Sequence, residues 1–342
     1  MRQIKTEDAV GHVLCHDMTQ IIKGITKDVA FRKGHVVREE DIPVLLSLGK
    51  DHLFVWEAGQ DMVHENDAAA VLYKLCASSN MHPSEVKEGK IEVLADCDGV
   101  LLVDTQKLRR INALGKMMIA TRHNGTKVSK GDKLAGTRII PMVIHKDNLE
   151  EAQRIGAGEP ILVLRPFLAK KTAVIATGNE VFYKRIVDSF TPVITEKVRE
   201  FGGVICDQDV LPDKPELITA RILEAIDKGA EMVICTGGMS VDPDDKTPLA
   251  IKNTGADIVS YGAPVLPGAM FLLSYYAGTI PVLGLPGCVM YAKRTIFDLV
   301  LPRLMADARI TREDLAGLGH GGLCLSCDVC TYPNCGFGKG AS

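Results

Sequence analysis

The feature that most constrains the fold is a regular alternation of short apolar runs and helical segments between residues 171 and 238. The apolar runs lie at 172–176, 204–206 and 231–235. Between the second and third runs, Ile218, Ile222 and Ala225 recur at the spacing of one helix face. Strands that alternate with helices of this length predict βαβ units, with a mostly parallel sheet covered by helices on both faces.

The sequence predicts four segments along the 342 residues, which differ in composition and in secondary-structure pattern. Residues 1–60 form a small α/β segment, and residues 61–165 form a β-rich subdomain that ends in a hinge at 160–166. Residues 170–310 form the α/β domain, and residues 317–342 form a Gly/Cys-rich tail. The predicted fold class is therefore α/β, a mostly parallel sheet sandwiched by helices, preceded by a smaller α+β and β-rich region.

Charge and composition exclude several classes of function. A net charge of −3 and an aromatic content of 5% give neither the basic surface nor the stacking platform that nucleic acid requires. Residues 258–292 carry no charge, but they contain nine Gly and Pro residues, which a lipid-exposed helix could hardly accommodate. We therefore expect buried strands and turns there, no membrane partner, and a cytoplasmic protein without a signal peptide.

Three small, turn-forming sequences follow predicted strands of the α/β domain. They are Thr177-Gly178-Asn179-Glu180, Thr236-Gly237-Gly238-Met239-Ser240 and Leu285-Pro286-Gly287. Ligands of open α/β sheets bind outside the carboxyl ends of the strands, where glycine lets backbone amides approach a phosphate. One such turn is a weak signal because most turns of this kind contain glycine. Three turns at the same edge predict a site for a phosphate-bearing ligand.

An acidic stretch follows the second turn, and it holds the candidate catalytic residues Asp244 and Asp245. Carboxylates beside a phosphate usually act through a divalent cation, since the bare anions repel each other. The alternative is that Asp245 or Thr247 only caps a helix that begins near Pro248. Eight of the nine histidines precede residue 146, so a Ser-His-Asp triad is disfavoured and phosphoryl or nucleotidyl chemistry is favoured.

The ten cysteines fall into two groups. Scattered ones such as Cys206 and Cys235 lie in apolar runs and are expected to be reduced core residues. The tail cysteines Cys324, Cys327, Cys330 and Cys335 have the close spacing of a zinc or iron–sulfur centre. A redox thiol or a disulfide is the alternative for this group.

Residues 172–305 resemble the molybdopterin-binding domain that molybdopterin molybdotransferases, molybdopterin adenylyltransferases and competence-damage-inducible proteins share. The resemblance rests on the order and spacing of the three glycine turns, of Asp188-Ser189, and of Asp244-Asp245-Lys246-Thr247-Pro248. It implies molybdopterin as ligand or substrate, with Asp244 and Asp245 acting with magnesium or molybdate. The residues that would bind the pterin and its phosphate are Thr177, Gly178, Asn179, Glu180, Asp188, Thr236, Gly237, Gly238, Ser240, Thr247, Pro286 and Gly287.

Departures from the motifs of the molybdotransferases leave two functions open. Ala269 stands where those proteins carry a lysine, Cys288 where they carry an asparagine, and Asp242 where they tend to carry a glycine. The chain either acts in molybdenum-cofactor biosynthesis by transferring molybdate or a nucleotidyl group to molybdopterin, or only carries or senses the cofactor. A carrier would present it to molybdoenzymes or other cofactor-assembly proteins, and a homo-oligomer is a further expectation. An unrelated nucleotide-binding regulator would fit the sheet but not the order of the motifs.

Overall fold

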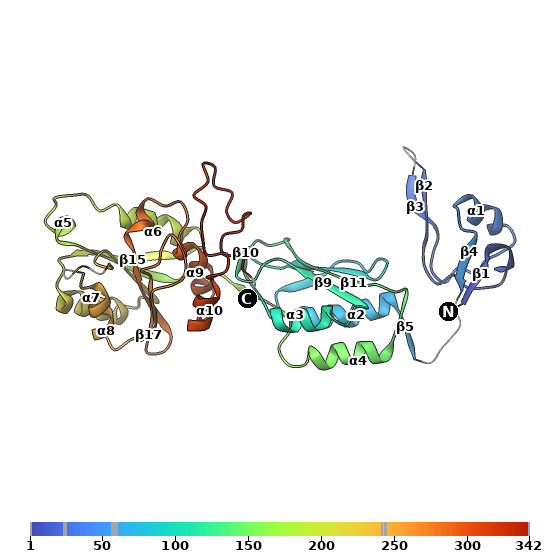
Figure 1. Cartoon of the computed structure of the whole chain (residues 1–342), viewed down its shortest axis with the longest axis horizontal. Helices are drawn as coiled ribbons and strands as arrows, with labels where there is room; N and C mark the ends of the chain where they lie inside the picture. The colour runs from blue at the N-terminus through green and yellow to red at the C-terminus, as the bar shows by residue number, and fades with distance from the viewer. Residues whose placement is uncertain (1, 23–25, 56–60, 241, 243–244, 341–342) are drawn as a thin grey trace. The chain divides into compact units, whose positions relative to one another are not determined.

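The computed structural model describes residues 2–22, 26–55, 61–240, 242 and 245–340, and Figure 1 shows its elements. Packing divides the chain into two compact units. The N-terminal unit comprises Met1–Asp96, Val103–Arg122 and Gly131–Val163, and the α/β unit comprises Cys97–Leu102, His123–Lys130 and Leu164–Ser342. The finer division into four segments stays a prediction.

The first part of the N-terminal unit is a small α+β arrangement around Leu14, Leu45 and Leu53, which are buried. Strand β1 (Arg2–Lys5) pairs antiparallel with β4 (His52–Val55), and β2 (Met18–Ile22) pairs antiparallel with β3 (Thr26–Phe31). The short helices are η1 (Thr6–Asp8) and α1 (Asp41–Ser47).

The second part of the N-terminal unit contains a four-stranded sheet and three helices. The sheet has the order β6 (Met81–Pro83), β7 (Lys90–Ala95), β11 (Lys133–Ile139), β9 (Met117–Thr121), and α2 (Glu65–Cys76) packs against β7 and β11. The other elements are β5 (Met62–His64), which pairs with β12 (Val143–His145), α3 (Thr105–Asn112) and α4 (Lys146–Ile155).

The α/β unit contains a six-stranded sheet. Its strands lie in the order β15 (Val204–Leu211), β14 (Lys171–Thr177), β16 (Met232–Thr236), β19 (Ile280–Leu285), β18 (Leu272–Tyr276), β17 (Asp257–Tyr261). The first four strands are parallel, and the last two join antiparallel. This confirms the predicted α/β fold class. Within the uncharged stretch 258–292, β18 and β19 are buried strands as expected, whereas the outer strand β17 is largely exposed, so the expectation is wrong there. None of the described helices has the length and apolarity needed to cross a membrane.

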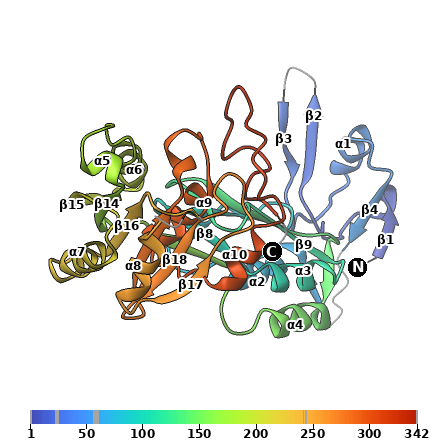
Figure 2. The same cartoon turned by 60° about the vertical axis from the view of Figure 1, so that its left-hand side comes forward.

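Helices cover both faces of this sheet, as Figures 1 and 2 show. On one face α6 (Phe190–Arg199) and α9 (Ile296–Met305) bury Ile194 and Phe297 against alternate strand residues such as Ile234. On the other face α7 (Pro215–Asp227) and α8 (Thr247–Asn253) bury Ile222 and Ile251. Residues that alternate along each strand enter the two cores in turn, which explains why the strands read as continuous apolar runs.

The outer strand β15 differs from its neighbours because the face that it turns toward α7 is polar. Asp207 and Asp209 both pair with Arg221 of α7, at 2.6 and 2.9 Å, and the Arg221 side chain is only 13% exposed. Cys206 on this strand is exposed, so the expectation of a buried thiol is wrong there. Cys235 on the central strand β16 is buried as expected, and burial raises its pKa to about 12.

The segment expected to be a hinge at 160–166 contains a strand, β13 (Leu162–Pro166), and the division between the two units falls within it, between Val163 and Leu164. It belongs to a three-stranded sheet with β8 (Gly99–Val103) and β10 (Thr126–Val128). Val100 of this sheet packs against Ala306 and Ala308, which follow α9. The proline at each end of the segment suggested a hinge, and that role stays a prediction.

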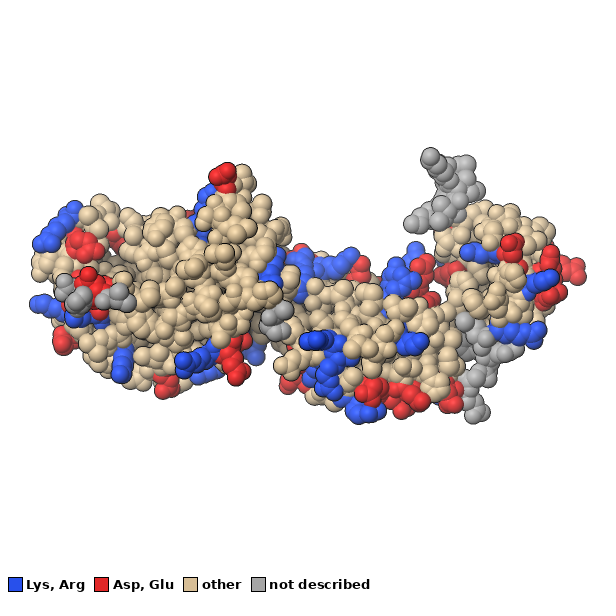
Figure 3. Space-filling view, viewed as in Figure 1, with Lys and Arg blue, Asp and Glu red and all other residues tan. Residues whose placement is uncertain are grey.

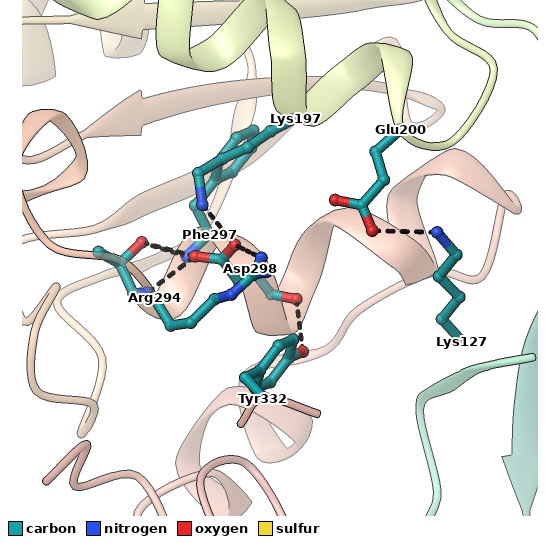
Figure 4. Close-up of polar contacts among 8 residues, drawn as sticks. Lys127, Lys197, Glu200, Arg294, Phe297, Asp298 and Tyr332 are labelled. Atoms are coloured by element: carbon teal, nitrogen blue, oxygen red, sulfur yellow. Dashed lines mark hydrogen bonds and ion pairs between the residues drawn. The ribbon is translucent and has the colours of Figure 1, made fainter. Parts of the chain in front are cut away.

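Besides the charged side chains at the surface, which Figure 3 shows for one face, a buried ion-pair network lies in the first turn of α9 (Figure 4). The Asp298 side chain is 4% exposed and accepts hydrogen bonds from Lys197 of α6 and, at 2.9 Å, from Arg294. Its other oxygen accepts from the backbone N–H of Thr295 at 2.8 Å, which completes a capping box. Two cations therefore share one buried carboxylate.

Candidate ligand site at the carboxyl edge of the sheet

The structure brings the three glycine turns together. Strands β14, β16 and β19 are neighbours, and the register pairs Ala176 with Thr236 and Thr236 with Leu285. Each glycine turn begins at or directly after these residues. The turns consequently line one edge of the sheet side by side, as the sequence predicted, although the role of their residues in binding stays a prediction.

Glycine is required at the central turn for a steric reason. Gly237 has a φ of +84°, and a Cβ there would lie 2.0 Å from the carbonyl oxygen of Thr177. Gly238 has a φ of +53° and would place a Cβ 3.0 Å from the Thr247 hydroxyl. The turn after β16 thus packs directly on the end of β14, leaving no room for a side chain between them.

Three buried threonine hydroxyls lie at this edge. Thr177 Oγ1 donates to the carbonyl oxygen of Thr236 at 3.0 Å and lies 2.9 Å from Thr247 Oγ1. The Thr236 hydroxyl is itself buried and has no hydrogen-bond partner among the described residues. An unpaired buried hydroxyl costs about 1–3 kcal/mol. An oxygen-rich ligand group that accepted this hydrogen bond would remove the cost.

The first turn is held by one long-range hydrogen bond and by contacts within the turn. The N–H of Asn179 donates to Asp213 Oδ2 at 2.9 Å, and the Glu180 carboxylate folds back over Gly178. Asp188 Oδ1 accepts from the N–H of Phe190 at 2.8 Å and so begins α6. Asp213 was missed by the sequence reasoning, because no motif marks it and only the fold brings it beside Asn179.

In the described part of the acidic stretch, neither Asp245 nor Thr247 occupies the N-cap position of α8. The residue before α8 is Lys246, whose side chain makes no capping hydrogen bond, and the Thr247 hydroxyl is engaged with Thr177. Asp245 is half-buried and accepts from the N–H of Asp242 at 3.3 Å, so the capping alternative is wrong for this carboxylate. Asp244 lies outside the residues that the structure describes.

Tyr261, at the end of β17, reaches the same turn and was not predicted. Its hydroxyl donates to the carbonyl oxygen of Met239 at 3.0 Å and lies 3.4 Å from that of Ser240. Burial raises the Tyr261 pKa, and the negative charge of Asp245 raises it further. A protonated Tyr261 therefore holds the segment that connects the glycine pair to the acidic stretch.

The third turn is open on the side of its glycine. A Cβ on Gly287 would meet no atom within 4 Å, whereas Cys288 in η2 (Gly287–Met290) is half-buried, which raises its pKa. The loop that contains Ala269 crosses the same edge, because β18 runs opposite to β19 and pairs Leu272 with Gly284. The position at which the resemblance would place a lysine thus lies at the candidate site.

Metal ligands are not preassembled in the part of the chain that the structure describes. Within those ranges no three His, Cys, Asp or Glu side chains form a group that could hold a metal ion. This holds for Asp245 at the acidic stretch and for the four tail cysteines. Magnesium and the tail metal therefore stay proposals.

The comparisons with known proteins point to the same domain. Residues 173–306 match the family model described as "Probable molybdopterin binding domain", and residues 3–57 match a domain of unknown function, DUF8806. A CinA-like protein of Fervidobacterium nodosum is 35% identical over 85 residues, which are 25% of this chain and 21% of the relative.

Two further matches also cover only part of this chain. A molybdopterin molybdenumtransferase of Synechococcus elongatus is 26% identical over 208 residues, covering 57% of this chain and 49% of that protein. The solved tungsten cofactor synthesizing protein MoaB of Pyrococcus furiosus has 19% identity and a TM-score of 0.34, covering 42% of this chain and 98% of that one. The chain thus spans half or less of the length of these two curated relatives. Over residues 173–306, the chain is thus similar to the family described as a probable molybdopterin binding domain.

Proposed function

We propose that the carboxyl edge of the six-stranded sheet binds a molybdopterin-type ligand, and that the chain acts in molybdenum-cofactor biosynthesis. The observation that carries this proposal is the alignment of three glycine turns on adjacent strands of a domain similar to this family. Backbone amides in such turns donate to phosphate oxygens, and the unpaired Thr236 hydroxyl offers one more donor.

In this proposal Asp245 works with magnesium. Asp245 does not cap α8, and two residues further on the N–H of Thr247 donates to the carbonyl oxygen of Gly238 at 3.3 Å, which brings the end of the acidic stretch to the glycine pair. A divalent cation between this carboxylate and the ligand phosphate would remove their mutual repulsion. The chain's own contribution would be to hold the cation, and Asp244 and molybdate belong to the same proposal.

A carrier without turnover is the second candidate, and Ala269 favours it. This residue lies on the loop that crosses the binding edge, so that loop offers no lysine to an oxyanion at this position. A carrier would hold the cofactor and pass it to a molybdoenzyme or a cofactor-assembly protein. Rapid, stoichiometric molybdate insertion by the purified chain would refute the carrier and support the transferase.

Gly287→Ala tests the ligand site with little risk to the fold, because the added methyl group would meet no atom within 4 Å. We expect the thermal midpoint to stay unchanged while affinity for molybdopterin falls at least tenfold, since the methyl group fills ligand space. The matched control is Gly136→Ala in the N-terminal unit, where a Cβ also meets nothing. Titration by calorimetry under anaerobic conditions measures both variants. No molybdopterin binding by the wild-type chain would refute the proposed function.

A further inference from the structure

The cysteine-rich tail is built onto the α/β unit at two places. At the first place, the N–H of Leu266 donates to the carbonyl oxygen of Gly322 at 2.8 Å, and the N–H of Cys324 donates to the carbonyl oxygen of Leu266 at 2.8 Å. Further along, the Tyr332 hydroxyl donates to the carbonyl oxygen of Asp298 at 3.1 Å, and Phe337 is buried in the core between the sheet and α9. The tail is therefore a packed part of this unit.

Between these anchors the chain makes a closed loop. The N–H of Gly338 donates to the carbonyl of Gly321 at 2.9 Å, and a Cβ on Gly340 would lie 1.6 Å from the carbonyl oxygen of His320. Apart from one bridge at Leu323, the segment after α10 (Arg312–Gly317) forms neither helix nor strand, and it extends as a long loop in Figure 1.

A long irregular loop that is ordered needs a cross-link or packing contacts to offset the entropy lost when the loop is closed. Loops of more than about 12–15 residues without regular structure are uncommon in compact domains, and each pays a closure entropy. This loop contains Cys324, Cys327, Cys330 and Cys335, all as free thiols. Apolar packing supplies no such link at its tip, since Leu325 and Val329 are 78% and 77% exposed.

Positive charge collects where the loop meets the domain. The ammonium group of Lys293 donates to the carbonyl oxygen of Asp328 at 2.8 Å, and the Arg294 guanidinium lies near Cys330. Arg294 also lies over the Tyr332 ring, 4.8 Å from its centroid. Arg294 and Lys197 share the single carboxylate of Asp298, as Figure 4 shows. Together with Lys293 they are three cations against the carboxylates of Asp298 and Asp328, which leaves a net positive charge. Such a surplus suits an anionic centre.

We propose that the four tail cysteines bind one thiolate-ligated metal centre, either a zinc ion or an iron–sulfur cluster, with Lys293 and Arg294 as its counter-charges. A zinc ion that displaces four thiol protons leaves a centre of charge −2, which the two cations offset. Cys324 and Cys335 are half-buried against the domain core, whereas Cys327 and Cys330 are exposed. The thiols are not yet gathered among the described residues, so binding also orders the loop tip, as metal capture commonly does.

The centre would border the candidate ligand site. Leu266 belongs to the loop that crosses the carboxyl edge of the sheet, and Lys293 follows the third glycine turn by a few residues. Both contact the tail directly. This position suits a group that stiffens the edge or faces a partner there, and that consequence alone rests on the proposed function.

The test compares the full-length wild type with a Cys327→Ser/Cys330→Ser double variant and a Cys206→Ser control. All three substituted thiols are exposed, and only Cys206 lies outside the tail, on β15. Each protein is prepared anaerobically and loaded in separate samples with Zn²⁺ alone or with Fe²⁺ and sulfide. Bound metal is then measured by elemental analysis and absorption, and folding by circular dichroism.

We expect the wild type and the control each to retain one metal centre per chain. This centre is either a zinc ion in the zinc-loaded samples, or iron and sulfide with charge-transfer absorption in the iron-loaded samples. The double variant should keep its fold and lose at least tenfold in metal affinity. A wild-type chain that retains neither metal, an equal retention by the double variant, or a disulfide between tail cysteines in the anaerobic protein would each overturn the proposal. Because the readout is bound metal, its failure is distinct from a failure to bind molybdopterin.

Discussion

The Asp298 network gives a stability prediction that can be worked out from the structure. Asp298→Asn keeps an oxygen that can accept from the Thr295 N–H, so the cap is largely retained, but it removes the charge that Lys197 and Arg294 share. The Lys197 and Arg294 side chains are 13% and 29% exposed, so neither is fully hydrated once the carboxylate is gone. The variant thus isolates the ionic part of the network.

The expected size follows from that burial. Removing one partner of a buried ion pair costs about 3–5 kcal/mol, and we take the lower end because Arg294 is partly exposed. Asp314→Asn is the matched control, since Asp314 also completes a capping box and pairs with Arg303 at 3.0 Å. The Asp314 side chain is 31% exposed, and a pair of that exposure contributes about 1 kcal/mol or less. We therefore expect Asp298→Asn to cost about 2 kcal/mol more than its control.

Urea denaturation followed by circular dichroism measures the difference, with hydrogen exchange of α6 and α9 peptides assigning the transition to the α/β unit. The midpoint should fall while the urea dependence stays constant. One molar salt should reduce the effect of Asp314→Asn more than that of Asp298→Asn, because exposed pairs are screened. Equal losses for the two variants would refute the reasoning that the buried carboxylate is held by its two cations.

Three further predictions concern the sheet and its edge. Thr236→Val and Thr172→Val each remove a buried hydroxyl that has no partner among the described residues, so both variants should be as stable as the wild type or more stable. In parallel titrations, only Thr236→Val should weaken molybdopterin binding, by about tenfold. Asp245→Asn should lower magnesium-dependent affinity at least tenfold with little change in the thermal midpoint, and equal affinities with and without magnesium would contradict the proposed role. The hydrogen bond from Arg221 lowers the pKa of Asp207, so this carboxylate stabilises the fold above its ordinary pKa of 3.8 and loses that contribution as the pH falls through the folded-state value. Denaturation at several pH values should show the wild type and Asp207→Asn converging in acid, and a constant difference would contradict this pairing.

Sequence patterns predicted the parallel part of the fold because their signals are local. The run 172–176 became β14, and the helix face of Ile218 and Ile222 became α7. The antiparallel strands β17 and β18 were expected only as buried strands, since nothing local fixes the direction of a strand. Cys206 was misplaced because an apolar run does not reveal that its strand is the outermost one.

The candidate site shows the same division between local and long-range information. The glycine turns are visible as motifs, and the rule for strand ends places them at one edge. The contacts of Tyr261 with Met239 and of Asp213 with Asn179 join positions that are 22 and 34 residues apart, and no pattern marks them. The packing of the tail depends on Tyr332 and Phe337, which read as ordinary loop residues until the fold brings α9 beneath them.

The polar face of β15 has a consequence for self-association. An outer strand is a template on which another chain can extend a sheet, and charged side chains facing inward are one way in which proteins prevent it. Asp207 and Asp209, held by Arg221, place two carboxylates along this strand. A second copy that added a strand there would have to dehydrate both of them. Any oligomer of this protein should therefore form through another surface, and solutions should stay free of fibrils while these carboxylates keep their charge.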